Sequence, residues 1–168
     1  MLQLFRVWSE LCLLRRTPQD IPASGILLGI SLCCYALVSV LVSLPGYGVG
    51  RALLLALTDL TLLFAFVCSL LLMQARAARI NQTLSAMAGS GSVLGLVALP
   101  LLLATGAGAS AETVPVSLAV LWLLLLLWNI LVVAHIIRHA LSSSWLVGFG
   151  LSLMYALISM QIIGSLFS

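Results

Sequence analysis

Residues Val116 to Ile137 read VSLAVLWLLLLLWNILVVAHII, and only Ser117, Asn129 and His135 interrupt their apolar side chains. No formally charged residue lies among them. At about 1.5 Å of rise per residue, a helix of this length covers roughly 33 Å, enough for the ~30 Å hydrocarbon core of a bilayer. Unpaired backbone amides cost several kcal/mol in lipid, so this segment must pair its own amides. It therefore predicts a membrane-spanning α-helix.

The composition of the whole chain agrees with this prediction. Of the 168 residues, 63% are apolar and only 7% are charged, whereas about 25% of the residues in soluble domains are charged. A water-soluble fold is therefore excluded. All seven basic residues are Arg, and the net charge of +3 is too small and too scattered for a nucleic-acid interface.

Four further apolar runs occur in the chain, three before residues 116–137 and one after them. Short connections, several of them rich in Gly, Pro or Ser, separate the runs. We expect spans at about 23–44, 52–73, 84–103, 116–137 and 145–167. The predicted fold class is all-α: a single domain over 1–168, built as a polytopic membrane bundle of five transmembrane helices.

The N-terminal residues have a different pattern. Leu4, Trp8, Leu11 and Cys12 recur at helical spacing, and a Pro-containing linker follows up to about residue 19. We expect an amphipathic helix that lies on the membrane surface. Its apolar face could equally dock on a partner protein.

The arginines predict the orientation. If the N-terminus is cytosolic, only Arg51 faces outward, and six arginines face inward: Arg6, Arg15, Arg16, Arg76, Arg79 and Arg138. Short cytosolic loops carry such an excess of Arg. We therefore expect a multi-pass protein of the bacterial inner membrane, with a cytosolic N-terminus and a periplasmic C-terminus.

Three pairs of small residues at i, i+4 spacing lie toward the inner ends of the first, third and fifth spans: Gly25 and Gly29, Gly91 and Gly95, Gly148 and Ser152. Small residues allow helix backbones to approach closely in lipid. The three pairs predict that these spans pack tightly against one another.

Three polar residues are expected to be buried among the spans. Asp59 is the only acid within an apolar run, Gln161 lies at a similar depth, and Asn129 lies near the middle of the membrane. We expect Gln161 or Arg51 to bind Asp59 and Asn129 to bind across a helix interface. Asp59 is interpreted either as a packing residue or as a proton or ion site.

His135 and His139 share a helical face, but Arg138 lies between them and the Glu of a zinc-protease pattern is missing. We predict no metal and no other cofactor. Seven residues are expected at one cytosolic rim: Arg15, Arg16, Arg76, Arg79, His135, Arg138 and His139. The rim is either a surface for anionic lipid or a protein partner, or only a consequence of the positive-inside rule.

The sequence lacks a G-x-S-x-G motif, a P-loop and a paired-carboxylate site, so we predict no catalytic residues and no enzyme. The expected function is that of an accessory, scaffold or assembly subunit, with the lipid bilayer and a membrane-protein partner or a second copy as its contacts. The alternative is a small transporter or channel that uses Asp59.

Three phrases carry a resemblance to a known family: RRTPQDIPAS at 15–24, RINQTLSAMAGSG at 79–91 and LLLWNILVVAHIIRHAL at 125–141. They resemble the bacterial members of the Yip1-like (Yip1 domain) family of small five-span membrane proteins. The resemblance implies a non-enzymatic partner or scaffold protein. The eukaryotic relatives, which act in membrane trafficking, have a long cytosolic region before their first span, and we do not expect such a region here.

Overall fold

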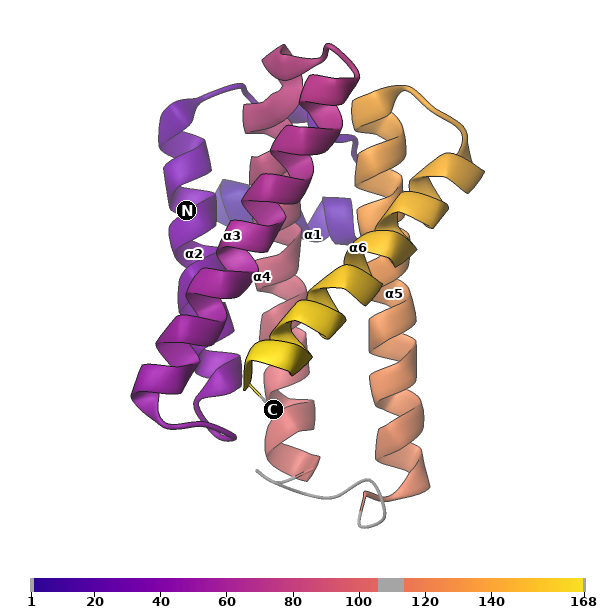
Figure 1. Ribbon diagram of the computed structural model, residues 1–168. Coiled ribbons are helices and arrows are strands. Elements are labelled where there is room, and N and C mark those ends of the chain that lie inside the picture. The colour runs from indigo at the N-terminus through magenta and orange to yellow at the C-terminus, as the bar shows by residue number, and fades with distance from the viewer. Residues whose placement is uncertain (1, 106–113, 168) are drawn as a thin grey trace.

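The computed structural model describes residues 2–105 and 114–167, and within these residues the chain is helical with no strand (Figure 1). The elements are α1 (Leu2–Cys12), α2 (Gly25–Ser43), α3 (Val49–Met73), α4 (Ile80–Thr105), α5 (Val116–Leu141) and α6 (Trp145–Phe167). Two short 3₁₀ turns, η1 (Pro18–Asp20) and η2 (Ala77–Arg79), precede α2 and α4.

Five of these helices are long and apolar enough to cross a membrane, namely α2 to α6. The prediction of an all-helical chain with five such helices is therefore confirmed. Their outward faces are lined with Leu, Val, Ile and Met side chains; Leu146, for example, is 81% exposed. Such faces are stable only in contact with lipid or with another apolar surface.

The helix α4 lies at the centre of the bundle. It packs against α2 and α5, contacts α3, and receives α1 on its remaining side. All eight residues from 83 to 90 are buried, and five of them are Ser, Ala or Gly. Small side chains at these positions let several helices approach one backbone at the same depth.

The helix α6 differs from the other four long helices because it crosses the bundle obliquely (Figure 1). Its first half packs against α5, and it also contacts α3 on the opposite side of the bundle. The close approach is at Gly148, where an added Cβ would lie 2.6 Å from the carbonyl oxygen of Ala134 on α5. The absence of a side chain at Gly148 thus permits this crossing.

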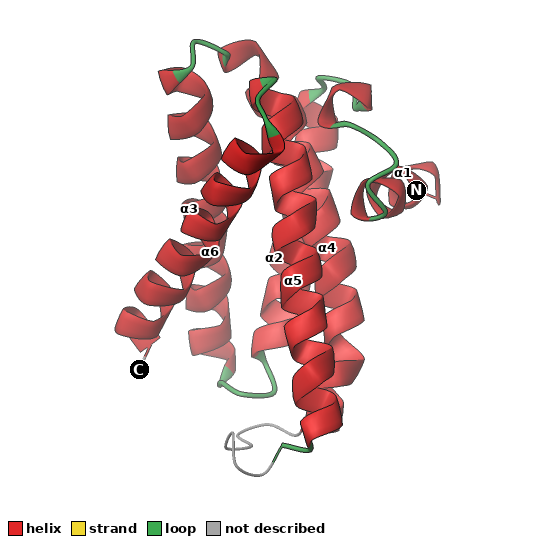
Figure 2. Cartoon of the chain, turned by 90° about the vertical axis from the view of Figure 1, so that its right-hand side faces the viewer, coloured by secondary structure: helices red, strands yellow, loops and turns green. Residues whose placement is uncertain are grey.

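The N-terminal helix α1 lies against the bundle on the side away from α3 and α6 (Figure 2). Trp8, Leu11 and Cys12 are buried, and the indole of Trp8 occupies the space that a Cβ on Gly89 of α4 would need. The apolar side chains thus dock on the chain's own central helix. Arg6 and Glu10 form an ion pair at 3.0 Å, and Arg16 pairs with the same carboxylate.

Candidate functional site

A cavity of about 210 Å³ lies among the five long helices, and every one of them contributes to its wall. Polar side chains come from all five: Tyr35 of α2, Asp59 of α3, Ser90 of α4, Asn129 of α5, and Ser152, Tyr155 and Ser159 of α6. The remaining wall is largely apolar. A concave site with a few converging polar groups in an apolar wall is the usual form of a ligand site.

Tyr35 and Asp59 form the main polar contact of this cavity. The hydroxyl of Tyr35 donates a hydrogen bond of 2.6 Å to Oδ2 of Asp59, and this bond joins α2 to α3. The Tyr35 ring also lies under Gly91 of α4, where an added Cβ would be 2.5 Å from Tyr35 Cε2. Tyr35 therefore positions the Asp59 carboxyl relative to three helices.

Other polar groups at the cavity have unused hydrogen-bonding capacity. The Oγ of Ser159 is buried and has no hydrogen-bond partner within residues 2–105 and 114–167. The side chain of Asn129 makes no hydrogen bond to these residues either. Ser90 and Ser152 instead donate to carbonyl oxygens of their own helices, at 3.2 and 2.8 Å. A buried hydroxyl without a partner costs about 1–3 kcal/mol, which favours a bound water or ligand beside Ser159.

The expected partners of Asp59 differ from those observed. Gln161 is exposed and does not line the cavity, and Arg51 is exposed at the first turn of α3. Arg51 precedes Asp59 by eight residues, about 12 Å along a helix. The hydrogen bond comes from Tyr35, so the prediction that Gln161 or Arg51 would bind Asp59 is corrected.

Asn129 is near the middle of α5 but is exposed rather than buried within a helix interface. It lines the cavity of Asp59 and also a neighbouring cavity of about 220 Å³ that shares Tyr35 and Gly91. The side chain therefore faces the same interior space as Asp59, although no helix contact satisfies it.

The three small-residue pairs have different environments. Gly91 and Gly95 lie against α2, where added Cβ atoms would be 2.5 Å from Tyr35 and Val38. On α6, Gly148 lies against α5, and Ser152 is 1% exposed. No atom lies within 4 Å of a Cβ built on Gly25 or Gly29, and both residues are exposed. Spans one and three, α2 and α4, therefore pack tightly on each other as expected, whereas span five, α6, packs on α5 and α3 instead.

The segment between α1 and α2 is bonded to α4 and α5. Trp128 Nε1 donates to the carbonyl oxygen of Cys12 at 3.0 Å, and Gln82 Nε2 donates to that of Ile21 at 2.9 Å. In the other direction, Gln19 Nε2 donates to the carbonyl oxygen of His139 at 3.1 Å. These bonds hold the end of α1 against the middle of α5, and the segment after it against the first turn of α4 and the end of α5.

Arg76 and Arg79 of the predicted rim bind the C-terminal end of α5. Arg79 Nη1 donates to the carbonyl oxygens of Ala140 at 2.9 Å and His139 at 3.3 Å, and Arg76 Nη1 donates to Ser142 Oγ at 2.8 Å. The last carbonyls of a helix lack intrahelical partners and carry partial negative charge. The two guanidinium groups therefore cap α5, a role that the sequence did not predict.

The two histidines lie beside each other, with ring centroids 4.5 Å apart. Nε2 of His135 is 3.0 Å from the carbonyl oxygen of Arg16. A carbonyl oxygen only accepts, so this contact places a proton on Nε2 and removes that nitrogen as a metal ligand. The described residues contain no group of three or more His, Cys, Asp or Glu side chains suited to a metal.

The other rim residues are distributed around the same end of α5. Arg138 lies over the ring of Trp145 at 5.3 Å, and Arg16 is bound to Glu10, whereas Arg15 is exposed. The hydrogen bond from Arg6 lowers the pKa of Glu10, and Arg16 lowers it further. Several rim residues thus make internal contacts, whereas Arg15 is exposed.

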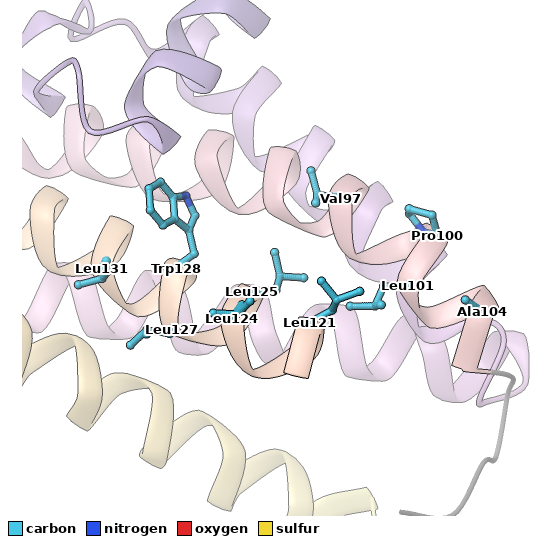
Figure 3. A pocket seen from close by; sticks show the side chains of 10 residues that line it. All are labelled: Val97, Pro100, Leu101, Ala104, Leu121, Leu124, Leu125, Leu127, Trp128 and Leu131. Atoms are coloured by element: carbon cyan, nitrogen blue, oxygen red, sulfur yellow. The ribbon is translucent and has the colours of Figure 1, made fainter. Parts of the chain in front are cut away.

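A larger groove of about 610 Å³ lies between the ends of α4 and α5 (Figure 3). Its wall is formed by side chains such as Val97, Pro100, Leu121 and Leu125, with no charged residue. Among the side chains that line the groove, only Trp128 carries an N–H group, and this group already donates to the carbonyl oxygen of Cys12. Lipid chains suit such an open apolar groove, but it offers no group that could orient a polar ligand.

Sequence reasoning identified Asp59 and Asn129 but missed Tyr35 and Ser159. Tyr35 lies on α2, one helix before Asp59, and a Tyr hydroxyl within an apolar run needs a partner, which is the signal that was available. Ser159 gives no comparable signal, because serines in membrane helices commonly bond to their own backbone. Comparison with family models, with curated proteins and with solved structures found no match to this chain.

Proposed function

We propose that this chain is a multi-pass, non-enzymatic protein of the bacterial inner membrane that binds a small solute or a proton at Asp59 and moves it across the bilayer, as a small transporter or channel. The N-terminus is cytosolic in this proposal, and the C-terminus is periplasmic. In this proposal α1 stays docked on α4 at Gly89, nine residues after the start of that helix.

The observation that carries the proposal is the cavity that all five long helices form around Asp59. An acidic side chain at this depth is costly unless it is paired or protonated, and such residues mark solute and proton pathways. Tyr35 supplies one hydrogen bond but no positive charge. A cation or a proton is therefore the natural occupant.

Flux across liposomes tests this proposal. The purified chain is reconstituted with a pH-sensitive dye inside the vesicles, and proton and cation gradients are applied in turn. We expect flux that Asp59→Asn abolishes and Asp20→Asn leaves unchanged, because Asp20 is bonded to Thr17 outside the long helices. Flux equal to that of protein-free vesicles under every gradient would contradict the proposal.

A second candidate is the accessory or assembly subunit, in which the chain acts through a partner or a second copy. The observation that favours it is the outward face of α2, where Gly25 and Gly29 have no neighbouring helix within 4 Å and Cys33, four residues further on, is exposed. Small residues that face lipid allow another helix to approach closely. Membership of the Yip1-like family and use of the basic rim as a binding surface belong to this second proposal.

Co-purification discriminates between the two candidates. A stable partner that is lost when Gly25 and Gly29 are both replaced by Leu supports the accessory role. Flux by the chain alone, without any partner, supports the transporter.

A further inference from the structure

The charge of the cavity limits what it can hold. Among the residues that line it, Asp59 is the only ionisable acid of the Asp or Glu type, and no Lys, Arg or His is present. A carboxylate in an apolar wall needs a positive partner, which the described residues do not provide there. A ligand that binds the ionised form of Asp59 must therefore supply that charge.

The hydrogen-bonding groups limit the ligand further. The Tyr35 hydroxyl proton is already donated to Asp59, so Tyr35 does not offer that proton to a ligand. The groups that can accept from a ligand are the Asp59 carboxylate, the side-chain oxygen of Asn129 and the Oγ of Ser159, on three different helices, and Asn129 and Ser159 also carry donors. An ammonium group has three N–H donors and no acceptor.

Size and wall chemistry complete the description. A volume of about 210 Å³ is below the range of about 300–1,000 Å³ that is typical of drug-sized ligands. Leu63, Ile130 and Val133 suit a short alkyl chain, and the rings of Tyr35 and Tyr155 can contribute cation–π attraction.

From this geometry we propose that the cavity binds a small primary alkylammonium ion, with Asp59 as its counter-ion and with Asn129 and Ser159 as acceptors for its N–H groups. The inference rests on the proposed function, because it names the substrate class of that same site. A quaternary ammonium ion of similar size has no N–H donor and leaves Ser159 and Asn129 unpaired, so the cavity discriminates against it.

Titration calorimetry of the full chain in lipid nanodiscs tests this assignment, with propylammonium chloride, tetramethylammonium chloride and 1-propanol as probes. We expect propylammonium to bind, tetramethylammonium to bind at least about tenfold more weakly, and propanol to give no saturable heat. Tenfold corresponds to about 1.4 kcal/mol.

Variants identify the groups responsible. Asp59→Asn should abolish propylammonium binding, and Ser159→Ala and Asn129→Leu should each weaken it about tenfold while leaving Asp59 in place. Ser165→Ala is the matched control on α6, because its hydroxyl bonds to the carbonyl of Ile162 and does not line the cavity. The control should bind as the parent chain does.

The outcomes separate this inference from the proposed function. Absent propylammonium binding together with Asp59-dependent proton flux overturns the ligand assignment and leaves the transporter standing. Binding that is insensitive to all three cavity variants also overturns the assignment. If neither binding nor flux is found, both proposals fail.

Discussion

The hydroxyl of Tyr35 lies 2.6 Å from Oδ2 of Asp59, and the ring that carries it is held under Gly91 of a third helix. This one contact fixes the position of the only acid within the long helices. It also uses the phenolic proton of Tyr35, which is therefore not offered to a ligand in the cavity.

Tyr35→Phe tests the importance of this bond. Loss of the donor leaves the Asp59 carboxyl without its hydrogen bond, so we expect destabilisation of about 1–3 kcal/mol and reduced flux. Thermal unfolding in detergent and the liposome assay measure the two effects. Tyr47→Phe is the control, because Tyr47 is exposed in the connection between α2 and α3; equal effects of the two variants would contradict a specific role of Tyr35.

Gly91→Ala tests whether the close approach of α4 to Tyr35 shapes the cavity. The added Cβ would be 2.5 Å from Tyr35 Cε2, so the ring must move and take its hydroxyl away from Asp59. We expect a lower unfolding temperature and a loss of flux. Gly29→Ala has open space around it and should stabilise α2 by up to about 1 kcal/mol through helix propensity. A Gly91→Ala variant as stable as the parent would show that Tyr35 is not confined.

Replacement of Arg76 and Arg79 by Gln together tests their role as caps of α5. We expect the variant to be less stable by about 1–3 kcal/mol, because the carbonyls of His139 and Ala140 lose charged donors. Arg15→Gln is the control, since Arg15 is exposed. If stability is unchanged and binding to anionic vesicles falls, these arginines act at the membrane surface instead.

Oxidative cross-linking in membranes tests the outward face of α2. If two copies pack through Gly25 and Gly29, Cys33 should form an intermolecular disulfide that Cys33→Ser removes. Cys12 should not compete, because burial raises the pKa of its thiol to about 11 and little thiolate is present at neutral pH. A monomer under all oxidant concentrations would exclude a second copy on this face.

The sequence predicted the long helices well, because their apolar length and the scarcity of charge admit no other structure in lipid. The start of α4 was less well predicted. The apolar run suggested a span from about residue 84, whereas α4 begins at Ile80. The first turn of α4 is polar, and its residue Gln82 donates a hydrogen bond to the carbonyl oxygen of Ile21. Hydropathy reports where a helix meets lipid and not where its hydrogen bonds begin.

The site was predicted in part. Asp59 was identifiable because a lone acid in an apolar run is costly, but its partner depended on which helices are neighbours. The spacing of residues within one helix does not tell which helices are its neighbours. The Gly25 and Gly29 pair was therefore expected at a contact between helices of the bundle, but it lies on the outward face of α2. The capping of α5 by Arg76 and Arg79 was hidden for the same reason, since it joins two loops that are about sixty residues apart along the chain.

The most direct test of the account is whether water-soluble reagents reach the cavity. Asn129→Cys and Leu123→Cys are placed separately on α5 in a chain whose native cysteines are replaced, and both are treated with a small charged thiol reagent in membranes. Both positions are exposed, but Asn129 lines the cavity and Leu123 lies on the apolar outer face. The account predicts that the cysteine at 129 reacts and that the one at 123 does not. If both remain unreactive, the cavity has no aqueous connection and Asp59 cannot bind a solute from water.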